Sequence, residues 1–193
     1  MPVSPWLAVA GDRAVLPASR WRPDTFCSNW WEMASNPIPD CFLDGPPVAA
    51  EVARGVTRLF CRHDLFAMCE VPLPNGRRAD LMAIGPKGEL TIVEIKVSRA
   101  DLLGDQKWTD YLDYCDRFFW AVPQLLAPLL EQERFMPGDA GLLVADRYDA
   151  AVIREPSTRL LASARRKAET LRFARRAARR LSAQIDPSLG DFL

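Results

Sequence analysis

The chain has 193 residues, with 25 basic and 25 acidic side chains and therefore no formal net charge. Its one histidine, His63, excludes a histidine-rich metal site and any hydrolase that needs a second histidine. The five cysteines are odd in number and never form a Cys-x-x-Cys pair, which excludes a disulfide framework and a zinc site. No apolar run approaches ~18 residues, so we expect a cytoplasmic protein without a membrane span.

Residues 1–46 form a separate N-terminal extension. Eight of the sixteen prolines fall within the first 47 residues, and no helical or strand periodicity survives them. The segment also holds more tryptophans than an ordinary disordered tail: Trp6, Trp21, Trp30 and Trp31. It either lays these side chains on the domain surface or serves as a partner-binding arm or base-stacking platform. A start codon assigned too far upstream would produce the same pattern.

A compact core is predicted from residue 47 to residue 156. Residues 48–62 carry apolar side chains at three- and four-residue spacing, which predicts a helix. Residues 65–73 predict a strand. Pro74-Asn75-Gly76 is a strong hairpin signal that leads into a second strand over residues 77–84.

A third strand, predicted over residues 89–96, carries two charges at its end. Alternate residues of a strand share a face, so Glu94 and Lys96 point the same way from a strand that is otherwise apolar. A short turn over residues 85–88 makes a hairpin that brings Asp80 alongside them. Buried charges are costly unless they are paired or bound to metal.

These charges predict a divalent-metal site. Asp80, Glu94 and the main-chain carbonyl of Ile95 are hard oxygen ligands, which suit Mg²⁺, with Mn²⁺ as the alternative. Lys96 would orient a water and stabilise charge on a phosphorus transition state. Two further carboxylates are candidates for the acidic shell: Glu51 and Glu70. The alternative is an ordinary cross-strand Lys–carboxylate pair on a solvated edge.

The stretch from Asp80 to the Glu94-x-Lys96 sequence resembles the PD-(D/E)XK nuclease superfamily. Ala79 stands where that superfamily usually has a proline, and this departure touches no ligand. The resemblance implies metal-dependent hydrolysis of phosphodiester bonds.

The next segment is expected to support the site. Ser98 is a predicted N-cap, with Asp101 at the capping-box position. A helix is predicted from Gln106 onward, and Lys107 and Tyr111 share one of its faces. In the superfamily such a helix reaches phosphate oxygens, whereas an ordinary amphipathic helix would bury its aromatic residues in the core.

The remaining core elements complete an α/β plan. Buried strands are predicted over residues 118–122 and 141–145, an edge strand over residues 150–154, and a short helix over residues 125–131. The resulting αβββαβ order is that of the restriction-endonuclease-like fold, with a mixed sheet flanked by helices.

Residues 157–193 are predicted to form a basic amphipathic helix and tail packed on the core, with Ser157 as the N-cap. From residue 154 onward there are ten basic and four acidic residues. Arginines suit bidentate phosphate contacts, although a solvated helix face would look the same. The apolar side, rich in alanine, disfavours a membrane-surface helix. That predicted stripe contains Leu160, Leu161, Ala164, Ala168, Leu171, Ala174, Ala178, Leu181 and Ile185.

A narrower resemblance covers residues 48–181. Several ordered motifs resemble the MmcB family of bacterial DNA-repair proteins, regarded as candidate endonucleases: Arg54-Gly55-Val56, Gly76-Arg77-Arg78-Ala79-Asp80, Ile92-Val93-Glu94-Ile95-Lys96, Asp105-Gln106-Lys107-Trp108, Tyr111, Cys115-Asp116-Arg117, and Arg165-Arg166-Lys167 through Leu171-Arg172-Phe173-Ala174. The resemblance implies a DNA partner and a role in repair of DNA damage.

The primary hypothesis is therefore a Mg²⁺-dependent DNA endonuclease, and the contrasting one is an inactive nuclease fold that binds DNA as a clamp or scaffold. The expected nucleic-acid contacts are Arg78, Lys107, Tyr111, Arg165, Arg166, Arg172 and Arg176. A protein partner for the N-terminal segment and a homodimer are both compatible with the sequence.

Overall fold

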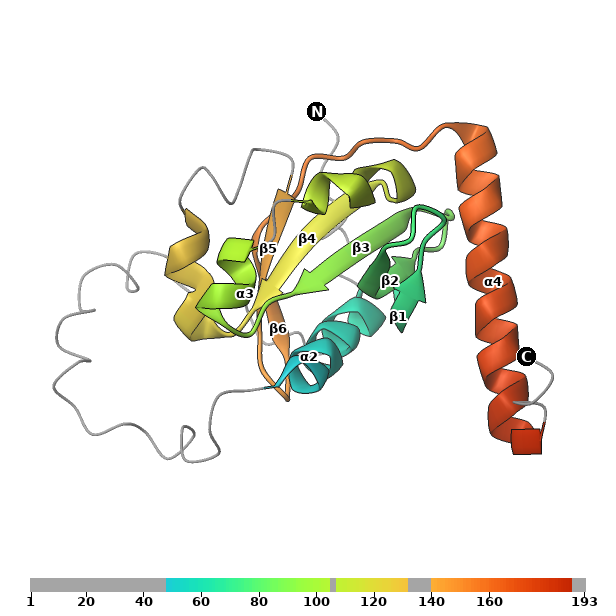
Figure 1. Ribbon diagram of the computed structural model, residues 1–193, viewed down its shortest axis with the longest axis horizontal. Coiled ribbons are helices and arrows are strands. Elements are labelled where there is room, and N and C mark those ends of the chain that lie inside the picture. Colours follow the sequence, from blue (N-terminus) through green and yellow to red (C-terminus); the bar gives the residue numbers. More distant parts are fainter. Residues whose placement is uncertain (1–47, 105–106, 132–139, 189–193) are drawn as a thin grey trace, which may run out of the picture. The chain divides into compact units, whose positions relative to one another are not determined.

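The computed structural model describes residues 48–104, 107–131 and 140–188, which belong to one compact unit. The predicted extension over residues 1–46 lies outside the described residues. Six strands form one mixed sheet in the order β1-β2-β3-β4-β5-β6 (Figure 1). The first three strands are antiparallel, β3, β4 and β5 are parallel, and β6 returns antiparallel to β5. The predicted mixed sheet flanked by helices is confirmed.

The strands β1 (Phe66–Pro72), β2 (Arg78–Ile84) and β3 (Leu90–Ile95) form the predicted meander. Both turns contain a glycine with positive φ, Gly76 at 81° and Gly88 at 76°, a conformation that costs glycine little. Local turn chemistry therefore sets the hairpin register, which pairs Leu81 with Val93 and Met82 with Ile92.

One face of the sheet is covered by α2 (Ala49–Arg62), as the apolar spacing of this segment predicts. Its Phe60 ring lies 6.5 Å from the ring of Phe119 on β4 (Arg117–Val122). Gly55 lets α2 approach the turn between β5 (Ala140–Ala145) and β6 (Ala150–Arg154), because an added Cβ would lie 2.2 Å from the Asp146 carbonyl oxygen. Any side chain at residue 55 would push this helix off the sheet.

The opposite face holds an aromatic cluster. Phe118 and Trp120 of β4 pack edge to face, with ring centroids 5.2 Å apart. Trp108 and Tyr111 cover them from the 3₁₀-helix η5 (Trp108–Tyr114), which replaces the helix predicted from Gln106.

Two short helices lie in the connections that follow β3 and β4. The α-helix α3 (Arg99–Gly104) follows β3, with Ser98 capping it as predicted through a 3.2 Å bond from the Asp101 amide. The predicted short helix after β4 is the 3₁₀-helix η6 (Gln124–Glu131).

The long C-terminal helix α4 (Ser163–Ile185) begins later than the predicted N-cap at Ser157. The preceding segment is extended because Asp116 engages it: the Arg159 amide donates to the Asp116 carbonyl, and the Leu161 amide donates to the Asp116 carboxylate, both at 2.8 Å. These long-range bonds outweigh the local capping preference of a serine. Figure 1 shows α4 beside the β1–β2 side of the sheet.

The predicted apolar stripe of α4 does not face the core. Phe173 and Glu169 are its buried residues among those described. Leu171 and Leu181 are each 58% exposed, and Ile185 is 78% exposed. The helix is therefore amphipathic, but its apolar side faces outward. No helix among the residues described combines the length and the apolar character needed to cross a membrane.

Candidate active site

The hairpin of β2 and β3 brings the two predicted carboxylates together. Continuing the register by one residue places Asp80 opposite Glu94, on the same face of the sheet. The Asp80 amide donates to Glu94 Oε1 at 3.4 Å, and Asp80 Oδ2 accepts a 2.7 Å bond from the Ile95 amide. The Asp80 carboxylate is thus fixed against the backbone of the neighbouring strand.

Lys96 completes the group at the end of β3. Its amide donates to the Ala121 carbonyl at 3.0 Å, which extends the parallel pairing with β4 by one residue. Its Nζ lies 3.7 Å from Glu94 Oε2 and 5.7 Å from the centre of the Trp120 ring. Glu94 is only 4% exposed and Lys96 8% exposed, so this ion pair is largely removed from water.

Burial and mutual repulsion change the acidity of both carboxyl groups. Burial raises the pKa of Glu94 to about 8, with the nearby Asp80 charge as the second cause. Burial also raises the pKa of Asp80, against the effects of the Ile95 hydrogen bond and of Lys96. Two carboxyl groups that resist ionisation together favour a proton or a cation between them.

This pair fits a hydrated Mg²⁺, because that ion uses one or two carboxylates and keeps several of its waters. Among the described residues, no group of three or more His, Cys, Asp or Glu side chains is gathered for a metal. Asp80 and Glu94 are therefore the carboxylates that could hold the ion, and water would supply most of the other ligands.

Glu51 and Glu70, the two further acidic candidates, are placed differently. Glu51 accepts a 3.2 Å bond from the Val48 amide and lies 3.3 Å from Arg147, at the start of the helix that covers the opposite face. It caps that helix, so the prediction that it could complete the metal shell is corrected. Glu70 is exposed on β1 and close enough to raise the pKa of Asp80. It is salt-bridged to Arg78, which satisfies its charge.

Tyr111 is buried rather than presented to a ligand. Its hydroxyl has one hydrogen, which it can donate to the Arg78 carbonyl, 3.3 Å away, or to the Glu94 carboxylate. The predicted nucleic-acid contact at Tyr111 is therefore corrected to a role in holding Glu94. Lys107 is exposed at the start of η5, where a phosphate could reach it.

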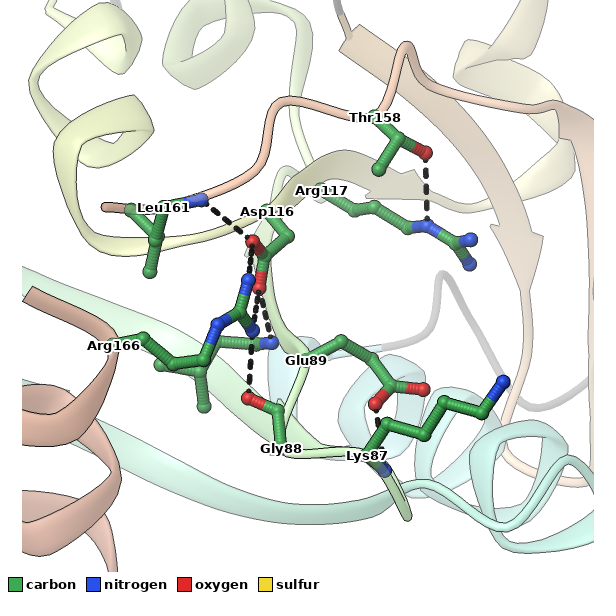
Figure 2. Close-up of polar contacts among 9 residues, drawn as sticks. Lys87, Gly88, Glu89, Asp116, Arg117, Thr158, Leu161 and Arg166 are labelled. Atoms are coloured by element: carbon green, nitrogen blue, oxygen red, sulfur yellow. Dashed lines mark hydrogen bonds and ion pairs between the residues drawn. The ribbon is translucent and has the colours of Figure 1, made fainter. Parts of the chain in front are cut away.

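The arginines of α4 divide into structural and exposed ones. Arg166 is structural: both of its terminal nitrogens donate to Asp116, at 2.8 and 2.6 Å, and it also donates to the Gly88 carbonyl at 2.9 Å. Figure 2 shows this guanidinium between the Asp116 carboxylate and the Gly88 carbonyl. Arg166 is thus held by a buried carboxylate and anchors α4, and the DNA contact at this residue stays a prediction.

Four other arginines of α4 stand nearer to solvent. Arg165 lies 5.0 Å over the Tyr114 ring, and Arg172 is paired with Glu169. Arg180 donates to the Glu70 carbonyl at 3.0 Å, which places it beside the acidic pair. Burial, followed by the charges of Arg180 and Arg179, lowers the pKa of Arg176.

Sequence reasoning missed three residues around the site. Asp101 was assigned a capping role alone, yet its Oδ1 lies 3.7 Å from Lys96 Nζ. Trp120 lies under the same ammonium, and Asp116 anchors α4. Asp101 had a readable signal, because it follows Lys96 by little more than one helical turn. Trp120 had none and Asp116 had only its place in the Cys115-Asp116-Arg117 motif, since both contacts join segments distant in the sequence.

The model of the DNA repair protein MmcB-like family matches residues 35–188, which is most of the chain. The chain belongs to this family. A solved structure, described as the SPO1766 protein of unknown function from Silicibacter pomeroyi, is 45% identical with a TM-score of 0.66. The match covers 72% of this chain and 92% of that one. No curated protein matches the chain. Membership of the MmcB-like family places the chain among DNA-repair proteins.

The raised pKa values of Glu94 and Asp80 predict a pH-dependent stability for this MmcB-like protein. The folded state keeps a proton on Glu94 up to a pKa of about 8, whereas the unfolded chain releases it near the ordinary glutamate pKa of 4.5. In metal-free buffer, the free energy of unfolding should therefore fall as the pH rises through this interval. Glu94→Gln should remove the part of this decrease in the free energy of unfolding that is due to Glu94. Asp113→Asn, at an exposed carboxylate, is the matched control. Denaturant unfolding at several pH values measures the effect, and an identical slope in wild type and Glu94→Gln would contradict it.

Proposed function

We propose that the protein is a Mg²⁺-dependent DNA endonuclease of the PD-(D/E)XK type with a restriction-endonuclease-like core. The observation that carries the proposal is the meeting of Asp80, Glu94 and Lys96 at the end of one hairpin. Membership of a DNA-repair family supports DNA as the substrate. Mn²⁺ is the alternative ion, because it accepts the same oxygen ligands.

In this proposal each side chain of the site has its own role in hydrolysis. Asp80 and Glu94 would hold the cation, which when bound polarises the scissile phosphate and makes a nearby water more acidic. Lys96 would position that water and stabilise negative charge as the water oxygen joins phosphorus and the bond to the leaving oxygen breaks. Tyr111 would keep Glu94 oriented through its hydrogen bond.

The basic side chains would hold the DNA backbone. Arg78 and Arg180 both contact Glu70, next to the acidic pair. Lys107, Arg165, Arg172 and Arg176 remain candidates at the surface. Because such contacts release counterions, binding should weaken as the salt concentration rises.

The decisive experiment is a nicking assay on supercoiled and single-stranded DNA, with Mg²⁺ or Mn²⁺ against EDTA. Metal-dependent cleavage is expected in wild type, and Asp80→Asn should reduce it by at least about a hundredfold because one of the two carboxylates is lost. Asp113→Asn is the matched control, since it removes an exposed carboxylate elsewhere. Cleavage that survives in Asp80→Asn would refute the proposed site.

A second candidate function is a DNA-binding clamp without catalysis. The observation that favours it is that Glu94 and Lys96 already satisfy each other, while no third carboxylate joins the pair among the residues described. The same assay separates the two functions. A clamp binds DNA in a salt-sensitive manner and produces no nicks with either metal.

A further inference from the structure

The outward side of α4 carries an apolar seam with a regular pattern. We define the seam as the residues Leu171, Ala174, Ala178, Leu181 and Ile185, all of which are exposed. They follow one another at intervals of three, four, three and four residues, which is the spacing of a helix–helix contact. Scattered exposed leucines need no explanation, but a continuous seam in this register on a core-anchored helix does.

The seam is not a misplaced core face. The side of α4 that faces the sheet is fixed by Arg166, Glu169 and Phe173, through the bidentate bond to Asp116 and the burial of the other two side chains. Turning the seam inward would break that anchored arrangement. The apolar residues of the seam therefore need a partner from outside this part of the fold.

The order of residues in the seam identifies the partner. Four of the five seam residues, Leu171, Ala174, Ala178 and Leu181, read the same in both directions, in residue type and in spacing, whereas the mirror position of Ile185 is Lys167. A two-fold axis between antiparallel helices brings each residue against its mirror position, so such a palindrome is self-complementary. We propose that the protein forms a homodimer through an antiparallel pair of α4 helices.

In this pairing the two alanines lie opposite each other at the centre, and the leucines close the two ends. Leu171 of one copy packs on Leu181 of the other, and Ala174 packs on Ala178. Small side chains at the centre let the two helix axes approach closely. The four layers span about 15 Å along the axis at ~1.5 Å per residue.

The charges that border the seam are compatible with this occupant. The positions that border the seam toward the core side are uncharged: Thr170, Ala177 and Gln184. The exposed arginines Arg172, Arg175 and Arg179 recur at three and four residues along the opposite flank of the helix. A two-fold antiparallel pair places the arginine flanks of both copies on the same side of the interface, where they remain in solvent and repel each other only weakly.

The pair is short, so we expect a weak dimer at the small end of specific interfaces, with a dissociation constant of about 1–100 µM. Sedimentation equilibrium of the full chain tests this without DNA or metal. Reductant is required because Cys61 and Cys69 are exposed free thiols that could cross-link the protein. If no dimer forms, the nuclease proposal is unaffected, because the proposed interface contains none of the proposed catalytic residues.

Three variants test whether the interface lies at the seam. Leu171→Glu with Leu181→Glu should weaken dimerisation at least a hundredfold while the thermal midpoint stays close to that of wild type, because both side chains are exposed in the single chain. Arg175→Ala with Arg179→Ala, on the other flank, should leave the dimer intact. Ala178→Leu should weaken the dimer, because a larger side chain at the centre separates the two helix axes. If the association were only unspecific hydrophobic contact, the same change would strengthen it.

Three results would overturn the proposal. The first is a wild-type protein that is monomeric at about 200 µM. The second is a dimer indifferent to the double glutamate change, which would place the interface elsewhere. The third is an Ala178→Leu protein that associates more strongly, which would indicate unspecific contact or a different partner for the seam.

Discussion

Replacement of Lys96 by alanine is expected to lower the rate of DNA cleavage by about a hundredfold to a thousandfold, the range found when one charge-stabilising donor is removed from an active site. The ammonium is almost buried and lies 3.7 Å from Glu94, where charge would develop during phosphoryl transfer. DNA affinity should change by less than about threefold, because exposed arginines and lysines dominate phosphate binding. Single-turnover cleavage and fluorescence anisotropy measure the two quantities.

Lys87→Ala is the matched control for this experiment. Lys87 lies in the exposed turn between β2 and β3 and carries the same charge on the same hairpin, away from the acidic pair. Its loss should leave the cleavage rate unchanged. A Lys96→Ala protein that cleaves as wild type does would end the proposed mechanism, and one that no longer binds DNA would assign Lys96 to affinity instead.

Replacement of Asp116 by alanine is expected to destabilise the fold by about 3–5 kcal/mol, as is usual when one partner of a buried ion pair is removed. The Asp116 carboxylate accepts bonds from the Leu90 and Leu161 amides, both at 2.8 Å, as well as two from Arg166. Its removal leaves a half-buried guanidinium and two amides without these acceptors. Urea unfolding followed by circular dichroism measures the loss.

The control for Asp116→Ala is again an exposed acidic residue. Asp113→Ala removes a carboxylate three residues earlier and should change stability by less than about 0.5 kcal/mol. A double variant with Arg166→Met should lose less than the sum of the two single changes, since each one removes the same pair. A loss below about 1 kcal/mol in Asp116→Ala would contradict the anchoring role.

The sequence predicted the parts of the site that depend on local rules. Turn residues set the β2–β3 register, and strand alternation then puts Asp80 and Glu94 on one face. Lys96 follows from the same alternation. These three residues meet in the structure because short-range geometry alone determines their positions.

The sequence could not predict contacts that join distant segments. Within their own helices, Arg166 and Tyr111 both have the pattern of surface side chains. In the structure, however, Arg166 binds the Asp116 carboxylate and Tyr111 hydrogen-bonds Glu94. The sequence predicts the stripe through Leu171 and Leu181 to be a core face, because helical periodicity identifies an apolar side without identifying what covers it.

The two ends of α4 are attached to the sheet with different strength. Near its start, Arg166 is bound to a buried carboxylate, whereas near its end Arg180 makes one exposed bond to a main-chain oxygen. In the single chain, local opening follows the weakest contacts, so the C-terminal turns should fray well before the rest of the domain unfolds. A nucleic acid that contacts Arg179 and Arg180 would therefore meet the flexible end of the helix. This end could adjust to the curvature of a bound backbone, while the start of the helix keeps its position.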